Sequence, residues 1–512
     1  MRTFARIFAV AVTLSVSLFS PRPYLAAQVN HVAPLQPGPA ANPQLAADLR
    51  AQIDSAVGDA VQKAKLPSAS IAIVKDGLIV YTQAYGDARL QPATPARPDM
   101  RYSIGSISKQ FTAVAVLMLQ DEGKLSIDDK ISKWLPQLTR ANDVTLREVL
   151  SHTSGYQDYW PEDYVMTTMM QPTQADAILK GWGQKPLDFE PGTQWQYSNT
   201  NYVIAGRIVE MVAKQDLFQL LQQRIFAPLA MQSVMNQDYR RLPDTDAEGY
   251  YRHALGPLRP APKEGFGWMF AAGELAMTAH DLALWDIALM NRDARILSQR
   301  GWSDLEEEVK LKNGKGTNYA LGVQVGNRGG HLAIMHSGEV SGFVAMNVAW
   351  PDLHDAVCVL TNLDASNGAG MAARAVAPIS FPELRMAPKP SAADATPPPQ
   401  KPVSEKPQLS AGDQTLQTQA REIFLGLQQD KIDRALMTKL TNDYFTQEAL
   451  DDYAQSLAAL GAPIKFEQVA TEPRGGMVFH AYSVNFANGK SVEVTTYIEP
   501  DGKIEQYLVS PE

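Results

Sequence analysis

The sequence predicts an α/β protein of the α+β kind, built as two domains. Asp76-Gly77 lies between two β-rich runs, at 70–74 and 78–82, and that dipeptide there predicts a β-hairpin. Apolar residues at helical spacing over 45–64 predict an amphipathic helix before the hairpin. Near the C-terminus, helical patterns come first and strand-like runs follow, which is typical of a separate small α+β domain.

Composition narrows the range of functions. The 512 residues leave room for more than one domain, and 45% hydrophobic with 20% charged residues is usual for a globular protein. A net charge of −9 without a basic run argues against nucleic acid as a partner. The single cysteine, Cys358, excludes an intrachain disulfide and is predicted to be a buried strand residue.

Residues 1–27 are predicted to be a secretory signal peptide. Arg2 and Arg6 precede a short apolar run, and Ala26-Ala27 offers a cleavage site. The run is too short for a comfortable membrane span, so no stable span is expected after cleavage. We therefore expect a periplasmic or secreted protein with 28–44 as a flexible lead-in; the sequence leaves open whether the signal is cleaved.

A nucleophile is suggested by Ser106-x-x-Lys109, at the front of a helix that is expected to end at Gly123. This helix is apolar on nearly every face, as buried helices are. Positions i and i+3 are neighbours on a helix, so the Lys109 amine is expected beside the Ser106 hydroxyl. Burial lowers the pKa of a lysine, and a serine beside such an amine is activated. Because about one Ser-x-x-Lys is expected by chance in a chain of this length, the pattern needs support elsewhere.

A second candidate group follows in the chain. Thr145 and Glu148 predict a capping box that starts a short helix ending before His152. We expect His152 to satisfy backbone carbonyls there rather than to act as a base. Further on, Tyr197 and Asn199 are two apart in an extended loop and would point the same way. A tyrosine with lowered pKa can act as a base, and an asparagine amide can hold a substrate carbonyl region.

A third candidate group lies in the segment 329–339, just before a strand-like run at 343–350. Gly338 and Gly342 mark places where a backbone or ligand approaches closely. His336, at a strand end, is placed to donate a hydrogen bond to a bound carboxylate or oxyanion.

In this order, the three groups resemble the motifs of the class C serine β-lactamases and their relatives: penicillin-binding D,D-peptidases, D-aminopeptidases and β-lactamase-like esterases. The motifs are Ser106-x-x-Lys109, Tyr197-x-Asn199 and His336-x-Gly338. The family's typical context also occurs, at 150–155, 190–192 and 272–275. The resemblance covers about 45–385 and implies a β-lactamase/transpeptidase-like fold, with an antiparallel sheet flanked by helices plus an all-helical region.

The resemblance also implies acyl transfer and gives each residue a role. Ser106 would form an acyl-enzyme, Lys109 would accept or relay its proton, and Tyr197 would be the partner base that later activates water. Asn199 would orient the substrate, and the backbone N–H groups of Ser106 and Glu339 would hold the oxyanion, at about 3 kcal/mol for each donor.

Substrate binding is the point at which the sequence departs from the family. His336 replaces the lysine of the true β-lactamases, while Gly338 opens the strand to substrate. A histidine of ordinary pKa is mostly neutral at pH 7 and holds a carboxylate less firmly than lysine. This departure favours esters or D-amino-acid peptides over efficient penicillin hydrolysis.

The sequence therefore favours an exported serine hydrolase acting on esters, D-amino-acid peptides or β-lactam-like amides. The alternatives are a β-lactamase proper and a penicillin-binding or scaffolding protein with little turnover. No His-Glu-x-x-His and no G-x-S-x-G pattern occurs, which argues against a metal hydrolase and an α/β-hydrolase. We expect no metal and no cofactor.

Residues 386–408 are predicted to be a Pro-rich linker, and 409–512 a small α+β domain of unknown function. Helical patterns occupy 414–429, 432–437 and 447–460, and strand-like runs occupy 464–471, 477–486, 491–498 and 503–508. The residues there that are capable of chemistry, His480, Tyr497 and Glu505, form no pattern. We expect binding or packing from this domain, with no part in catalysis and no identified partner.

Overall fold

The hairpin predicted at Asp76-Gly77 is present and begins a large antiparallel sheet. In this computed structural model, which describes residues 45–385 and 411–511, β1 (Ser68–Lys75) pairs with β2 (Leu78–Leu90) across that turn. The φ values of 50° for Asp76 and 74° for Gly77 are those of the two-residue turns that Asp-Gly favours. The predicted signal peptide 1–27, lead-in 28–44 and linker 386–408 lie outside the described residues.

The central sheet joins both ends of the segment 45–385. Within the described residues it has seven strands in the order β3-β2-β1-β12-β11-β10-β9, with antiparallel neighbours. The remaining strands are β3 (Ala93–Pro95), β9 (Gln324–Arg328), β10 (His331–Val340), β11 (Phe343–Trp350) and β12 (Asp355–Thr361). Ile71 in β1 is paired with Val359 in β12, so strands distant in sequence meet at the centre.

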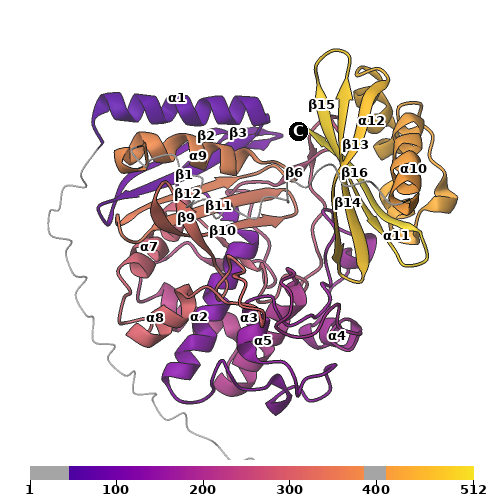
Figure 1. The fold of residues 1–512 in the computed structure, drawn as a ribbon. Coiled ribbons are helices and arrows are strands. Elements are labelled where there is room, and N and C mark those ends of the chain that lie inside the picture. The colour runs from indigo at the N-terminus through magenta and orange to yellow at the C-terminus, as the bar shows by residue number, and fades with distance from the viewer. Residues whose placement is uncertain (1–44, 386–410, 512) are drawn as a thin grey trace, which may run out of the picture. The chain divides into compact units, whose positions relative to one another are not determined.

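Helices cover both faces of this sheet (Figure 1). On one face α1 (Ala47–Ala64) packs beside α9 (Gly368–Ser380), and on the other lie α7 (Ala279–Met290) and α2 (Ser108–Asp121). Alternate residues of β12 serve the two cores: Val357 and Val359 face α1 and α9, whereas Cys358 faces the opposite core. The apolar run is therefore a strand buried on both faces, and Cys358 is the buried strand residue predicted.

A helical region packs against α2. It contains α3 (Leu146–Leu150), α4 (Ala175–Gly181), α5 (Asn199–Ala213), α6 (Leu217–Leu221) and α8 (Gln299–Glu306). Helix α3 begins with the predicted capping box: Glu148 N donates to Thr145 Oγ1 at 3.2 Å, and Thr145 N donates to Glu148 Oε2 at 2.8 Å. The predicted fold class is confirmed, because an antiparallel sheet is flanked by helices and a further helical region adjoins it.

Two small sheets lie beside these elements. In one, β8 (Leu275–Met277) pairs with both β4 (Tyr102–Ser103) and β5 (Met235–Asn236). In the other, β6 (Tyr250–Tyr251) pairs with β7 (Arg259–Pro260). Strand β4 leads directly into the segment that carries Ser106, so the first small sheet fixes where that segment starts.

Residues 411–511 form the second α+β domain, with helices first and an antiparallel sheet afterwards, as predicted. The helices are α10 (Ala411–Leu427), α11 (Lys439–Tyr444) and α12 (Gln447–Ala458). The strands are β13 (Pro463–Arg474), β14 (Met477–Phe486), β15 (Ser491–Ile498) and β16 (Ile504–Pro511), paired in sequence order. Helix α11 was not predicted, since six residues are too few to show a helical period.

Candidate active site

Ser106 lies where a short turn of 3-10 helix, η1 (Gly105–Ile107), runs into α2. Ile104 N donates to Leu275 O at 3.0 Å, which ties the start of η1 to strand β8. The Ser106 side chain is partly exposed and lines a cleft of about 620 Å³. From Ser108 to Leu119, α2 is buried throughout, so Lys109 is removed from water as the apolar pattern predicted.

The Lys109 amine lies 2.8 Å from three oxygen atoms: Ser106 Oγ, Asn199 Oδ1 and the Ala272 carbonyl. Asn199 Oδ1 and the carbonyl are acceptors only, so they take two N–H groups. In the uncharged amine, the third position is a lone pair, and it faces the Ser106 hydroxyl. The geometry therefore suits Lys109 as the acceptor of the Ser106 proton.

Burial lowers the pKa of Lys109 to about 7, against an opposing effect of the Asp158 carboxylate. Near neutral pH a large fraction of the amine is therefore unprotonated. This shift is the direction predicted from the buried helix, and it is what a base working at neutral pH requires.

Tyr197 lies beside this amine, with its ring centroid 4.9 Å from Lys109 Nζ. Its buried hydroxyl has no hydrogen-bond partner of good geometry among the described residues. Burial raises the pKa of Tyr197 above 10. The lowered pKa expected from the sequence is thus not found: Tyr197 is a neutral phenol, and Lys109 is the stronger candidate for the base.

His152 is a structural residue next to Tyr197, with the two ring centroids 4.3 Å apart. Ser198 N donates to His152 Nδ1 at 3.2 Å, so the ring accepts a backbone N–H instead of satisfying carbonyls as expected. Burial lowers the pKa of His152 and leaves it neutral. The ring supports the loop that carries Tyr197.

His336 lines the cleft, but both of its ring nitrogens are occupied. Nδ1 donates to the Ser337 carbonyl, so Nε2 is the acceptor for the Tyr319 hydroxyl at 2.9 Å. Burial lowers the pKa of His336 to about 4. A neutral histidine with both ring nitrogens bonded binds a carboxylate weakly. This strengthens the argument from the sequence, in which histidine replaces the lysine of the true β-lactamases. Tyr319 was missed because no motif marks it.

Gly338 brings β10 against η1. A Cβ at this position would lie 1.9 Å from the Ile104 carbonyl oxygen and 3.1 Å from Ser106 N. No side chain fits there, so the glycine at this point in the predicted motif is required by the close approach. The strand is thereby held next to the backbone N–H of Ser106, with Glu339 as the following residue.

Asn199 is fixed by a buried carboxylate, Asp158, that the sequence analysis did not single out. Asn199 donates to Asp158 Oδ1 through its backbone N at 2.9 Å and through Nδ2 at 3.1 Å. Asp158 also forms an ion pair with Arg474 at 3.3 Å. Asp158 and Arg474 were missed because their partners are far apart in sequence; the one available signal was the double glycine after Arg474, which marks only a turn.

The structure thus brings together Ser106, Lys109, Tyr197, Asn199, His336, Gly338 and Glu339, and all but Lys109 and Gly338 are among the residues lining the cleft.

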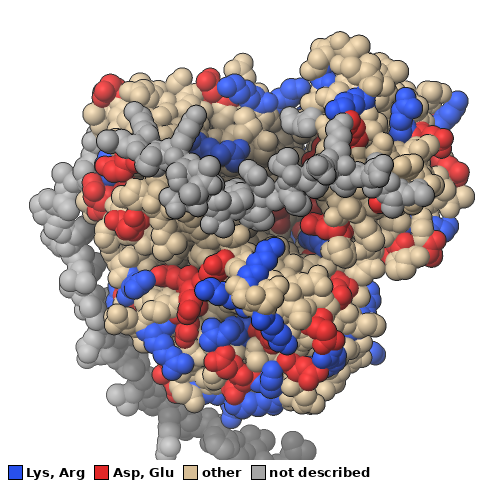
Figure 2. Space-filling view, in the orientation of Figure 1, with Lys and Arg blue, Asp and Glu red and all other residues tan. Residues whose placement is uncertain are grey.

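Among the described residues there is no group of acidic, histidine and cysteine side chains able to hold a metal ion. No helix in the described ranges has the length and apolarity needed to cross a membrane. Acidic and basic side chains are interspersed on the face in Figure 2.

Comparisons with known proteins identify the family of the segment that carries this site. A family model described as Beta-lactamase matches residues 53–379. Protein flp of Staphylococcus aureus (strain MW2) is 28% identical over 329 residues, which are 63% of this chain and 64% of that protein. D-aminopeptidase of Brucella anthropi is 29% identical over 287 residues, or 55% and 53% of the two chains. The matches thus span less than two thirds of these relatives.

A likeness extends to the second domain in one solved structure. The octameric penicillin-binding protein homologue from Pyrococcus abyssi aligns with 90% of this chain and 99% of its own, with 22% identity and a TM-score of 0.58. At 22% sequence identity, this similarity shows a shared fold and nothing more.

A serine beside a buried lysine, on a helix against an antiparallel sheet, is consistent with a serine hydrolase of the β-lactamase fold. The chain belongs to the Beta-lactamase family. The predicted resemblance is confirmed, and the D-aminopeptidase among the relatives is consistent with the predicted serine hydrolase.

Proposed function

We propose that this protein is an exported serine hydrolase that forms an acyl-enzyme through Ser106. The observation that supports it most directly is the Lys109 amine, 2.8 Å from Ser106 Oγ with its pKa lowered to about 7. The serine Oγ attacks a carbonyl carbon while its proton passes to Lys109 Nζ. Collapse of the tetrahedral intermediate expels an alcohol or amine, which takes up a proton, and water then hydrolyses the ester to Ser106.

The oxyanion is assigned to the backbone N–H groups of Ser106 and Glu339. Support comes from the contact of β10 with η1, since a Cβ on Gly105 would lie 2.7 Å from Glu339 N and one on Gly338 3.1 Å from Ser106 N. The two amides therefore belong to closely apposed backbones. Tyr197, as a neutral phenol, serves in proton relay between Lys109 and the leaving group, and Asn199 holds Lys109 in position.

For the substrate we propose D-amino-acid amides or peptides, with esters as less specific substrates. The D-aminopeptidase relative supports this choice. The neutral His336, at a position where the true β-lactamases have lysine, supports it as well. Export is proposed from the sequence of residues 1–27, and a periplasmic or secreted location from the same features.

Labelling of the serine tests the proposed nucleophile. Wild-type protein is expected to react with a fluorescent fluorophosphonate, and Ser106→Ala is expected to abolish the signal. Ser108→Ala is the matched control, because Ser108 lies on the same helix and is not among the described residues that line the cleft. Labelling that persists in Ser106→Ala would refute the assignment.

Initial rates test the substrate class. Nitrocefin, p-nitrophenyl butyrate, and the D- and L-alanine p-nitroanilides are compared on one preparation. We expect the D-alanine anilide to be cleaved faster than its L-isomer and than nitrocefin. A stoichiometric burst on nitrocefin without further turnover of any substrate would favour the penicillin-binding alternative.

A further inference from the structure

The hairpin between β13 and β14 brings part of the second domain into the cleft. Arg474 and the two residues before it line the same cleft as Ser106. The turn continues through Gly475 and Gly476, with φ of 63° and 83°. A Cβ on Gly475 would lie 3.1 Å from Pro161 Cγ, and one on Gly476 2.9 Å from Gln157 Oε1. The positive φ values favour glycine at both positions, and the turn lies directly against the 157–161 loop.

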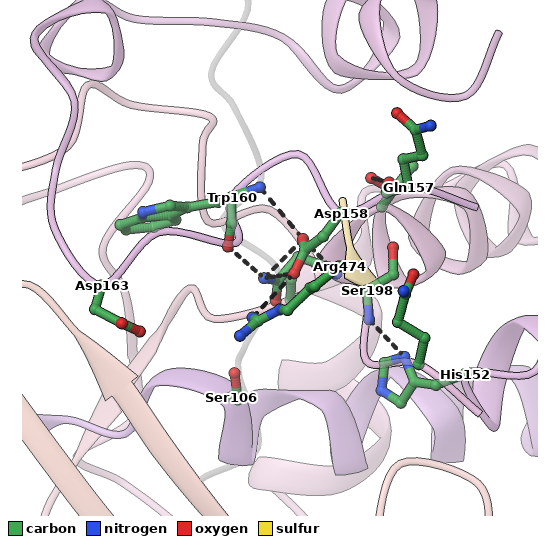
Figure 3. Close-up of polar contacts among 12 residues, drawn as sticks. Ser106, His152, Gln157, Asp158, Trp160, Asp163, Ser198 and Arg474 are labelled. Atoms are coloured by element: carbon green, nitrogen blue, oxygen red, sulfur yellow. Dashed lines mark hydrogen bonds and ion pairs between the residues drawn. The ribbon is translucent and has the colours of Figure 1, made fainter. Parts of the chain in front are cut away.

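The hairpin is also bonded to the loop that carries Tyr197. Gln196 Nε2 donates to the Pro473 carbonyl at 2.7 Å. At the tip, Arg474 Nη1 donates to the Tyr497 hydroxyl at 3.0 Å and Nη2 to Asp158 Oδ2 at 3.3 Å. The guanidinium is thus held by its own domain on one side and by the hydrolase domain on the other. Figure 3 shows Arg474 beside the Asp158 carboxylate.

Asp158 connects this contact to the base. Its side chain is 0% exposed, and that of Arg474 is 25% exposed. Asp158 bonds Asn199, and Asn199 in turn accepts from Lys109 at 2.8 Å. A buried carboxylate requires a counter-charge. If Arg474 were absent, Lys109 would be the cation left to pair with Asp158.

Apart from Asp158 and Arg474, the side chains around Lys109 carry no charge near neutral pH. The titratable or charged side chains that face it are Asp158, Arg474, His152, His336, Tyr197 and Tyr202. Burial lowers the pKa of both histidines and raises the pKa of both tyrosines. Within the described cleft, Asp158 and Arg474 are therefore the charges that decide the protonation of Lys109. Around Arg474 itself, Glu162, Asp163 and Glu339 add further carboxyl groups.

We propose that Arg474 is a positioning residue for acyl transfer, supplied by the second domain: it neutralises Asp158 and so leaves Lys109 free to take the Ser106 proton. This inference rests on the function proposed above. It assigns the 411–511 domain a part in the reaction, where the sequence analysis expected none.

The acid limb of the pH profile tests this role. kcat/KM on p-nitrophenyl butyrate is measured from pH 5 to 10, at the wavelength where p-nitrophenol and its anion absorb equally. In Arg474→Gln, the unpaired Asp158 favours protonated Lys109, so the limb should move to higher pH by about one unit. The rate should fall about fivefold at pH 7 and recover above pH 9. Arg474→Lys should keep the wild-type limb.

Two further variants separate charge from structure. Adding Asp158→Asn to Arg474→Gln removes the unpaired carboxylate and should move the limb back toward the wild-type position. Arg259→Gln is the matched control, because Arg259 pairs with Asp452 and Glu448 across the same two domains and does not line the described cleft. It should leave the limb unchanged.

Each outcome bears on one claim. An unmoved limb in Arg474→Gln, or an equal loss of rate at every pH, would overturn the role of Arg474 while Ser106 labelling leaves the nucleophile intact. Absence of Ser106 labelling in the wild type would instead overturn the proposed function itself.

Discussion

At the scale of single residues, Lys109 is the group whose environment matters most. Its amine has three oxygen neighbours at 2.8 Å and is withdrawn from water on a buried helix. Burial destabilises the charged form, so the pKa of Lys109 falls to about 7. Tyr197 is shifted the other way and stays a phenol. These opposite shifts support the proposal that Lys109 is the base and Tyr197 a relay, rather than two equivalent bases.

The pH dependence of the wild type follows from this assignment. Because Lys109 must be unprotonated to act, kcat/KM on an ester should rise with pH and reach half its plateau near pH 7. A pH–rate profile from pH 5 to 9 measures this limb. His336→Asn should show the same limb at whatever rate it retains, because the pKa of His336 is about 4 and that group does not titrate in this range. A limb near pH 5, or one lost in His336→Asn, would contradict the role of Lys109.

The site could be predicted where it is local in sequence. Ser106 and Lys109 are one helical turn apart, so spacing and burial alone gave their contact. Tyr319 and Asp158 were not predicted, because they reach the site through pairing with His336 and Asn199 that only the folded chain creates. The direction of the Tyr197 pKa was also missed, since it depends on burial by residues from several elements.

At the scale of elements, the contact between β10 and η1 places the backbone of the site. Strand β10 carries His336 and Gly338, and η1 carries Ser106. The gap between them is closed to the point that Gly338 has no room for a Cβ. Any displacement of the strand therefore changes the distance between the two proposed oxyanion donors.

Gly338→Ala tests this contact. A methyl group 1.9 Å from the Ile104 carbonyl would force β10 away from η1, so we expect turnover to fall at least about 100-fold, the scale of losing one oxyanion donor. Gly326→Ala in the adjacent β9 is the control, because no atom lies within 4 Å of a Cβ there. Rates and thermal unfolding are measured on both. Full activity in Gly338→Ala would show that the close contact is not needed.

The elements themselves were largely predictable. Strand β11 occupies the range expected, and the order of the second domain, helices first and four strands after, is confirmed. Periodicity and turn chemistry report local structure well. They do not report which strands become neighbours, so the central pairing of β1 with β12 is known only from the structure.

At the scale of the whole molecule, several polar contacts join the second domain to the hydrolase domain. Arg259 forms a bidentate ion pair with Asp452, whose side chain is 6% exposed. Gln506 and Asp163 exchange two hydrogen bonds, at 2.7 and 2.8 Å. The second contact holds the loop that lines the cleft, so the two domains share one functional surface.

Arg259→Gln should destabilise the protein without changing its chemistry. The substitution leaves Asp452 poorly paired, so the free energy of unfolding should fall by roughly 1–2 kcal/mol. Urea unfolding followed by tryptophan fluorescence measures the loss. An unchanged midpoint would show that this ion pair contributes nothing to docking.

The pairing of Ile71 with Val359 has a consequence for folding during synthesis. Contacts between positions so distant along the polypeptide slow folding, because the intervening loop must be closed first. A chain that leaves the ribosome or a translocation pore N-terminus first cannot complete its central sheet before β12 has emerged. The proposed nucleophile, Ser106, is thus synthesised early, and the site around it is completed only when the hydrolase domain is nearly finished.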